Sequence, residues 1–217
     1  MQSSNNIGTT MTPDFYLRPS QNHDIEYKVK KSRFIAHLRI TRTESEAKDI
    51  IREISFQFRD ASHNCWAYRF GYDPVSEYYS DAGEPSGTAG KPILTSIQRY
   101  KLSDTLIVVT RYFGGIKLGV RGLIEAYGIA ASLVIDKVPP IKVIPSLSIL
   151  VELTYPQLNP TIYYLSKLGI PESHVQTTYA DKVTLVVAVP LSCSHLAETY
   201  LASQKAAGQI LNYQILD

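Results

Sequence analysis

Glycine is concentrated in one part of this chain. Of its twelve glycines, seven lie between Gly83 and Gly122, in the segments SDAGEPSGTAGKP (80–92) and RYFGGIKLGVRG (111–122). Glycine adopts backbone angles that other residues avoid and lets neighbouring groups approach closely, at a cost in conformational entropy. Charged residues stand inside both segments. We therefore expect two loops, one before each of two helices, that shape a recognition surface rather than a packed interior.

The bulk composition is that of a globular protein with an ordinary core. Hydrophobic residues make up 44% of the 217 residues and charged residues 19%, and the net charge is +2. Such a balance neither supports nor excludes nucleic acid, because a local basic patch can exist on a near-neutral protein. Cys65 and Cys193 lie far apart and form no metal-binding spacing, so we expect reduced thiols in a cytoplasmic protein without a cofactor or metal.

Periodicity predicts a mixed first half. Period-two alternation over 25–30 and a second apolar run over 34–40 indicate an antiparallel pair of strands. Thr43 followed by Glu46 forms a capping box that begins a helix. Further strands are expected at 65–71, 76–80 and 106–110, and further helices at 92–100 and 119–135.

Prolines at 139, 140 and 145 predict a linker, after which the pattern changes. Strands at 147–154, 175–179, 183–189 and 209–215 and helices at 156–168 and 192–206 give the order βαββαβ, that of a ferredoxin-like unit. The fold class is therefore α+β with two domains. We expect a polar flexible tail over 1–22, a first domain over 23–140 and a ferredoxin-like domain over 143–217.

The loop 83–91 invites comparison with a phosphate-binding loop. The Walker spacing fails, because Pro85 stands where glycine is required and Pro92 follows Lys91. A weaker hypothesis keeps an anion at the start of the following helix, held near Ser86, Thr88 and Lys91. The alternative, which we favour for Thr88, is that a hydroxyl side chain caps that helix.

Two pairs of residues could carry catalysis. His63 and Cys65 share one face of a strand and could form a nucleophile pair, but a cysteine in an aromatic strand is more often a small buried hydrophobe. Asp81 and Glu84 could act as acid and base or hold a divalent ion. A loop ordered by hydrogen bonds from the backbone to Asp81 is the favoured alternative.

Basic and aromatic residues form a third set. Arginine and lysine interleaved with aromatic rings hold phosphates and stack bases in nucleic-acid-binding proteins. The alternative is that the rings fill the core and the charges are solvated; both remain open. The basic members are Arg69, Lys91, Arg111, Lys117 and Arg121, and the aromatic members are Tyr68, Tyr72, Tyr78, Tyr79, Tyr112 and Phe113.

Three motifs carry a family resemblance. HNCWAYRFG (63–71), YYSDAGEPSGTAGKPIL (78–94) and VVTRYFGGIKLGVRGLIEAY (108–127) resemble the IMPACT family, including its two-domain bacterial YigZ members. The resemblance implies that the first domain has the fold of the second domain of ribosomal protein S-five, a sheet with helices packed on one face. It also implies that the second domain is similar in fold to the last domain of translation elongation factor G.

The same resemblance implies a link to translation, since eukaryotic members regulate translation by binding a partner that would otherwise activate the amino-acid-starvation kinase. Those members have a different domain arrangement, with an N-terminal partner-binding module that is not expected in this chain. The resemblance implies no enzyme activity. This chain departs from the family pattern at two positions, reading SDAGEPSG for SDDGEPSG and GVRGL for GVGGL. Ala82 removes a carboxylate, which weakens a metal site. Arg121 adds a positive charge, which favours an anionic partner.

Together these observations predict a non-enzymatic cytoplasmic protein, not bound to membranes, that binds RNA, the ribosome or a translation-associated protein. The alternatives are an enzyme acting on a small molecule or phosphorylated ligand, with His63, Asp81, Glu84 and Lys91 in one pocket, and a protein-interaction module with an apolar patch around Tyr112 and Phe113. The expected binding surface comprises Arg69, Asp81, Glu84, Ser86, Thr88, Lys91, Arg111, Lys117 and Arg121.

Overall fold

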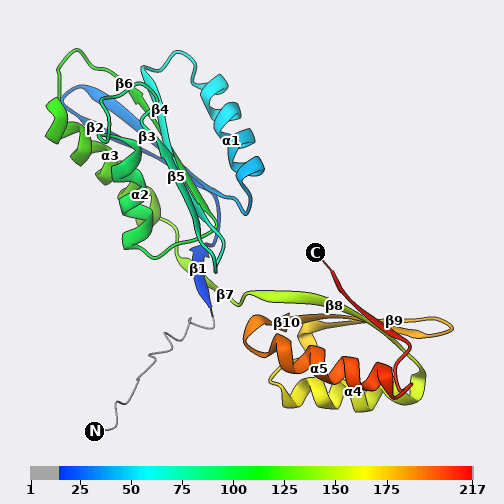
Figure 1. Cartoon of the computed structure of the whole chain (residues 1–217). Helices are drawn as coiled ribbons and strands as arrows, with labels where there is room; N and C mark the ends of the chain where they lie inside the picture. Colours follow the sequence, from blue (N-terminus) through cyan, green and yellow to red (C-terminus); the bar gives the residue numbers. More distant parts are fainter. Residues whose placement is uncertain (1–14, 217) are drawn as a thin grey trace, which may run out of the picture. The chain divides into compact units, whose positions relative to one another are not determined.

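The protein is described by a computed structural model that covers residues 15–216 (Figure 1). The chain divides into two compact units, Tyr16–Val143 and the residues from Ile144 onward. Each unit contains both helices and strands, so the mixed character predicted from the sequence is confirmed. Among the described residues, none of the helices combines the length and apolar character required to cross a membrane.

The first unit is built on a five-stranded antiparallel sheet. Its order is β2-β3-β6-β4-β5, so β6, the last of these five strands along the chain, lies in the middle of the sheet. The predicted pairing of the first two strands is confirmed by the register from His23–Leu38 to Val29–Ser32. The strands are β2 (His23–Val29), β3 (Ser32–Ile40), β4 (His63–Phe70), β5 (Ser76–Ser80) and β6 (Thr105–Tyr112).

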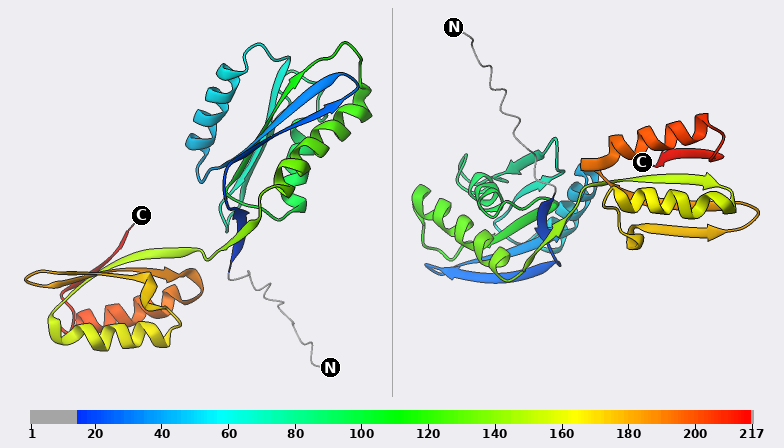
Figure 2. Two further views of the ribbon diagram at one scale, coloured as in Figure 1. Left: turned by 180° about the vertical axis from the view of Figure 1, so that it is seen from behind. Right: turned by 90° about the horizontal axis from the view of Figure 1, so that it is seen from below.

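Helices cover both faces of this sheet. Helix α1 (Glu44–Gln57) lies on one face, and α2 (Gly90–Arg99) and α3 (Gly119–Asp136) lie on the other (Figure 2). The expectation of helices on one face only, which came from the family resemblance, is therefore wrong for this unit. The reason is visible in the sheet, whose side chains form two separate apolar clusters.

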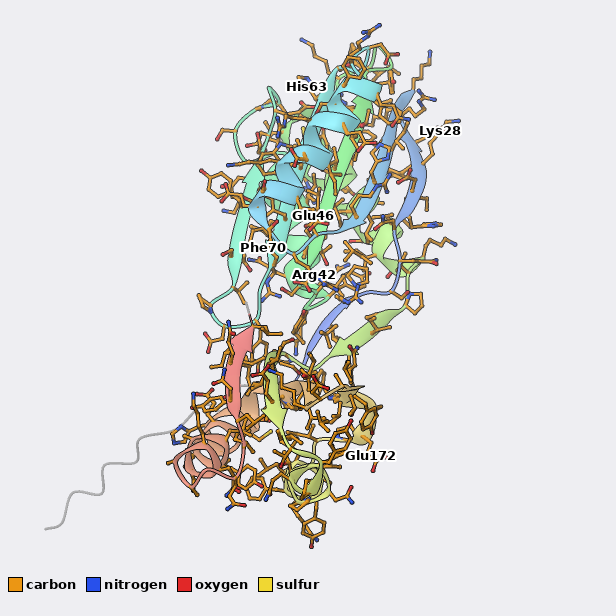
Figure 3. All side chains as sticks on the ribbon, turned by 90° about the vertical axis from the view of Figure 1, so that its right-hand side faces the viewer. Lys28, Arg42, Glu46, His63, Phe70 and Glu172 are labelled. Carbon is orange, nitrogen blue, oxygen red and sulfur yellow. The ribbon has the colours of Figure 1, made fainter. Side chains whose placement is uncertain are left out.

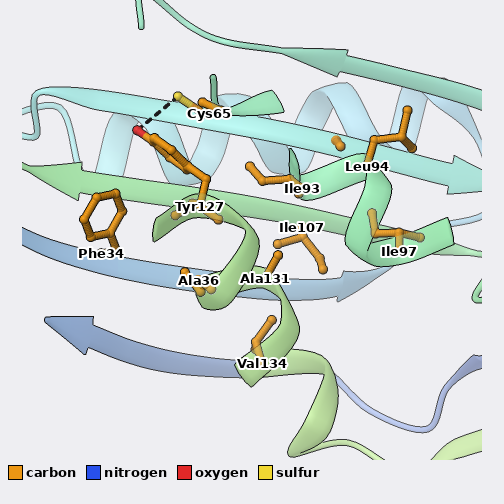
Figure 4. Close-up of a cluster of buried hydrophobic side chains, with 14 of the residues drawn as sticks. Phe34, Ala36, Cys65, Ile93, Leu94, Ile97, Ile107, Tyr127, Ala131 and Val134 are labelled. Carbon is orange, nitrogen blue, oxygen red and sulfur yellow. Dashed lines mark hydrogen bonds between the residues drawn. The ribbon is translucent and has the colours of Figure 1, made fainter. Parts of the chain in front are cut away.

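Strand β6 explains how one sheet supports two cores. Side chains alternate across a strand, so Ile107 and Val109 face α2 and α3 whereas Leu106 and Val108 face α1. All four are fully buried, as expected for a continuous apolar run in a central strand covered on both faces. On the α2–α3 side, Ile107 packs with residues of both helices (Figure 4).

Helix α1 begins as its sequence predicts. The hydroxyl of Thr43 accepts a hydrogen bond from the backbone N–H of Glu46 at 3.2 Å. The carboxylate of Glu46 accepts one from the backbone N–H of Arg42 at 2.9 Å. The first bond is the N-cap half of a capping box, whereas the return bond from Glu46 goes to Arg42, the residue before the N-cap.

Two short strands change the predicted boundaries. Strand β1 (Tyr16–Pro19) pairs antiparallel with β7 (Pro140–Val143), and the hydroxyl of Tyr16 donates to Asp104 at 2.6 Å. Residues 16–19 were predicted to belong to a flexible tail and 140–143 to fall at the linker; both belong to the first unit. Residues 1–14 of the predicted tail lie outside the described residues.

The second unit has the predicted element order, strand–helix–strand–strand–helix–strand. Its antiparallel sheet has the order β11-β8-β10-β9, with α4 and α5 on one face (Figure 1). Every second residue of β10 is buried, as expected where one face is covered. The elements are β8 (Ser146–Leu153), α4 (Tyr155–Lys167), β9 (Val175–Tyr179), β10 (Val183–Pro190), α5 (Ser194–Ala206) and β11 (Asn212–Leu216).

Candidate functional site

Asp81 orders the first glycine loop. Its carboxylate accepts hydrogen bonds from the backbone N–H groups of Gly87 at 2.8 Å and of Ala89 and Gly90 at 2.9 Å each. Burial acts to raise the pKa of Asp81, but these three bonds outweigh it and hold the pKa below its ordinary value. The loop is therefore ordered by the backbone contacts that the sequence favoured for Asp81.

The Asp81 carboxylate occupies the position at the start of α2 where an external anion would bind. The backbone N–H groups of Ala89 and Gly90, which an external anion would need there, already point at the Asp81 carboxylate. The prediction that Thr88 caps the helix is wrong, because its hydroxyl donates to the carbonyl of Pro85 at 2.7 Å and it is buried. Ser86 is exposed and does not cap the helix.

Glu84 and Arg111 form a buried ion pair. The Arg111 Nη1 donates to the Glu84 Oε1 at 2.5 Å, and both side chains are more than nine-tenths buried. The hydroxyl of Tyr127 donates to the same oxygen at 2.9 Å. Burial raises the pKa of Tyr127, so the hydroxyl keeps its proton and remains a donor. Arg111 and Glu84 are therefore inside the molecule rather than on the open basic face predicted from the sequence.

Cys65 lies beneath this pair and is not an activated nucleophile. Its sulfur lies 2.9 Å from the backbone carbonyl oxygen of Asp81 and 3.4 Å from the hydroxyl oxygen of Tyr127, two acceptors for the single thiol hydrogen. Figure 4 shows the contact with Tyr127. Burial raises the pKa of the thiol to about 12, which suppresses the reactive thiolate. The ring of His63 contacts the carbonyl of Ala82 at 3.0 Å. The buried-hydrophobe interpretation of Cys65 therefore holds.

A cleft of about 520 Å³ opens beside the Glu84–Arg111 pair. His63, Glu84 and Arg111 line it together with Phe113 and with residues 118–120, where α3 begins. The Nε2 of His63 lies 4.0 Å from the Glu84 Oε1. Lys117 also lines this cleft. Four predicted or considered residues thus meet here.

Arg69 is not part of this group. In the register of β4 and β6, His63 lies opposite Arg111, whereas Arg69 lies opposite Thr105. Six residues of strand separate the two positions, or about 20 Å. His63 and Phe70, the neighbour of Arg69, are the two end residues of β4, and Figure 3 shows them well apart. Arg69 donates instead to Glu77 and to the carbonyl of Leu102, each at 2.7 Å.

Lys91 faces a different cavity. It lies in α2 and lines a groove of about 660 Å³ between α2 and α3, together with Pro92, Ile124 and Gly128. The alternative enzyme site needed His63, Asp81, Glu84 and Lys91 in one pocket. The structure brings only His63 and Glu84 together, because Asp81 is bound to the backbone and Lys91 faces the groove. Among the described residues, no cluster of three or more candidate ligands could hold a metal ion.

Sequence reasoning missed two lysines at the same end of the sheet. Lys30 and Lys31 form the β2–β3 turn and are exposed. This turn packs against the second glycine loop so closely that a Cβ at Gly114 would lie 1.9 Å from the Lys31 carbonyl oxygen. The Lys30–Lys31 dipeptide was visible in the sequence, but its neighbour in space was not. The types of these residues do not reveal that the turn and the second glycine loop are in contact.

We call the exposed cations here the basic end of the first unit. It comprises Lys30, Lys31, Lys117 and Arg121, and none of the four forms an ion pair within the described part of the chain. Phe113 and Ile116, exposed to 48% and 43%, lie among them in the loop before α3. Free cations beside exposed apolar side chains can contact a polyanion and stack its bases.

The chain is similar to known proteins along most of its length. Residues 30–135 match the Impact N-terminal domain. The IMPACT family member YvyE of Bacillus subtilis is 48% identical over 118 residues, 54% of each chain. The IMPACT family member in pol 5′region of Thermus thermophilus is 33% identical over 131 residues, 60% of this chain and 70% of that one. The chain spans little more than half the length of YvyE and of several other curated relatives.

Both units are similar to one solved structure. The crystal structure of a protein described only as hypothetical covers 94% of this chain and 97% of its own, with 29% identity and a TM-score of 0.65. The arrangement of two mixed units in one chain therefore occurs in another protein.

Proposed function

The chain belongs to the IMPACT family, and from that premise we propose that it is a non-enzymatic cytoplasmic regulator of translation that binds RNA or the translation machinery. The observation that carries the RNA-binding part is the basic end. Four cations from the β2–β3 turn and the start of α3 stand together without acidic partners in the described residues. Unpaired lysine and arginine side chains of this kind neutralise phosphates and release counterions.

The fold assignments support the same proposal. We assign the first unit to the fold of the second domain of ribosomal protein S-five, with α1 as an addition on the second face of its sheet. We assign the second unit to the ferredoxin-like class, since its element order and its sheet order β11-β8-β10-β9 fit that class. Fold similarity alone is an analogy, so the weight of the proposal rests on the basic end.

A protein-interaction module is the second candidate, because one apolar patch is exposed. Phe113 and Ile116 in the loop and Val120 and Ile124 on α3 are all between 42% and 61% exposed. An exposed patch of this kind beside charged residues is typical of a binding surface for protein. The two candidates differ in their dependence on charge.

The test compares two charge reversals at opposite ends of α3. Lys117→Glu changes the basic end, and Lys137→Glu, which follows the last turn of α3, changes net charge equally. The affinity of each protein for a fluorescein-labelled 15-nucleotide single-stranded RNA is measured by anisotropy. We expect Lys117→Glu to weaken binding roughly tenfold and Lys137→Glu to change it less than twofold. Equal effects would contradict an RNA site at the basic end.

A further inference from the structure

Helix α3 has no acidic side chain in its first turn. Its N-cap residue is Leu118, which makes no side-chain hydrogen bond, and its first turn holds Arg121 and no acidic residue. By contrast, α1 has Glu44 and Glu46 in its first turn, and the start of α2 contacts Asp81. The first backbone N–H groups of a helix have no partner within it and carry partial positive charge. An 18-residue helix that starts in this way favours a negatively charged ligand.

The cleft described above opens at this helix start, since Leu118, Gly119 and Val120 line it. Arg111 lines the same cleft with a side chain that is only 7% exposed. Of its three guanidinium nitrogens, only Nη1 makes a hydrogen bond to another described residue, Glu84. The Nε is buried and has no partner in the described residues. A buried guanidinium with unused donors is an independent sign that this cleft accepts an anion.

Charge in the cleft has the sign that an anion requires. Arg111 and Lys117 contribute two positive charges and Glu84 one negative charge, and His63 lies 4.0 Å from Glu84. Lys117 is exposed and forms no ion pair within residues 15–216. The Glu84 carboxylate is already occupied by Arg111 and Tyr127, so it does not compete for Lys117.

The remainder of the cleft is apolar. Pro85, Phe113 and Leu123 line it, and Phe113 is half exposed at the rim. The volume of about 520 Å³ is larger than a phosphate needs and falls in the range of small-molecule sites. An anionic group attached to a flat ring therefore fits better than a free anion, because aromatic side chains stack bases.

We propose that this cleft binds the phosphate of a nucleotide against the first turn of α3, with its base near Phe113. Arg111 and Lys117 hold the phosphate oxygens together with the backbone N–H groups that begin the helix. The inference rests on the proposed function, for which it supplies the contact to the terminal phosphate of an RNA chain. It gives the end of the second glycine loop a role, since Gly119 lines the cleft at the helix start.

The first test is calorimetric titration of the full chain with adenosine 5′-monophosphate, adenosine and inorganic phosphate. We expect the monophosphate to bind at least tenfold more tightly than adenosine, and inorganic phosphate to compete with it. Equal binding of monophosphate and adenosine would overturn the phosphate contact. Equal binding of monophosphate and inorganic phosphate would overturn the contact with the base.

Two variants of one exposed residue locate the site. Val120→Asp places a carboxylate in the first turn of α3, where it occupies the N–H groups and repels a phosphate. Val120→Asn has the same shape without the charge. We expect Asp to weaken monophosphate binding at least tenfold and Asn less than twofold. Unchanged binding in Val120→Asp overturns the proposal. Lys117→Ala, which adds no charge at the helix, is expected to weaken binding about fivefold; no effect would contradict the role of Lys117.

An RNA titration separates this inference from the proposed function. The same 15-nucleotide RNA is prepared with and without a 5′-terminal phosphate and with and without a 3′-terminal phosphate. We expect one phosphorylated end to bind at least threefold more tightly, and this gain to disappear in Val120→Asp. If the RNA binds with the same affinity whether or not either end carries a phosphate, the nucleotide site is refuted but RNA binding at the basic end is not. If the protein binds the monophosphate but no RNA, the RNA-binding function is refuted and the nucleotide site is supported.

Discussion

Replacing Asp81 with Asn tests whether one side chain organises the first glycine loop and the start of α2. The amide oxygen can still accept from Ala89 and Gly90, but the amide nitrogen would face the N–H of Gly87, where the carboxylate now accepts at 2.8 Å. One charge-assisted hydrogen bond is lost, worth about 1.5–3 kcal/mol when buried. Negative charge at a helix start adds about 0.3–1 kcal/mol. Because Asp81 is partly exposed, we expect a total loss of about 2 kcal/mol.

The assay is urea unfolding followed by the fluorescence of Trp66, the single tryptophan in the chain. Trp66 lies in β4, so its signal reports on the first unit. With a slope of about 2 kcal/mol per molar urea, the loss lowers the midpoint by about 1 M. Glu53→Gln on α1 is the matched control, since Glu53 is exposed and its carboxylate accepts no hydrogen bond within the described residues. A midpoint shift for Asp81→Asn no larger than that of the control would refute the reasoning.

The effect also has a defined pH dependence. The pKa of Asp81 is lowered in the folded state, so the unfolded chain takes up a proton more readily there. The stabilisation is therefore complete above the unfolded pKa of about 3.9 and is lost as the pH falls through the folded value. We expect the difference in unfolding free energy between the wild type and Asp81→Asn to be constant above about pH 5 and to shrink below about pH 4.

Two further predictions concern packing and reactivity. Gly114→Ala should destabilise the first unit by more than 2 kcal/mol, roughly the cost of overpacking, because its Cβ would lie 1.9 Å from the Lys31 carbonyl oxygen; Gly115→Ala, with φ +84° and open space, should cost only about 1 kcal/mol, and equal midpoints in urea would contradict this. Iodoacetamide at pH 8 should modify Cys193 well before Cys65, whose thiol is fully buried and has a pKa raised to about 12; mass spectrometry showing Cys65 modified first would contradict its burial.

The fold was largely predictable because its signals are local. The period-two strands, the capping box at Thr43 and the βαββαβ order of the second unit all appear where the sequence placed them. The β1–β7 pair was not predictable in the same way. Each strand has four residues, and their pairing joins positions more than 120 residues apart in the chain. Short strands paired over such a distance leave no periodic pattern.

The candidate site was less predictable, because residue type does not reveal a charge's partner. Arg111 and Glu84 were both selected for an open surface, yet they form an ion pair inside the molecule. Arg69 was selected for the same reason, but it lies at the end of β4 away from the His63–Arg111 pair. The Lys30–Lys31 turn could be assigned to the basic end only from its contact with Gly114 in the folded structure. Such pairings depend on sheet order and register, which place β6 between β3 and β4.

The salt dependence of RNA binding tests the central claim most directly. The variant Lys30→Ala, Lys31→Ala, Lys117→Ala, Arg121→Ala removes the four cations of the basic end. Binding of the 15-nucleotide RNA is measured from 50 to 300 mM KCl. Each phosphate contact on a single strand contributes about −0.7 to the slope of log K against log salt, so removal of four should flatten the slope by about 3. A slope that is the same in the wild type and the variant would contradict an RNA contact at this end of the protein.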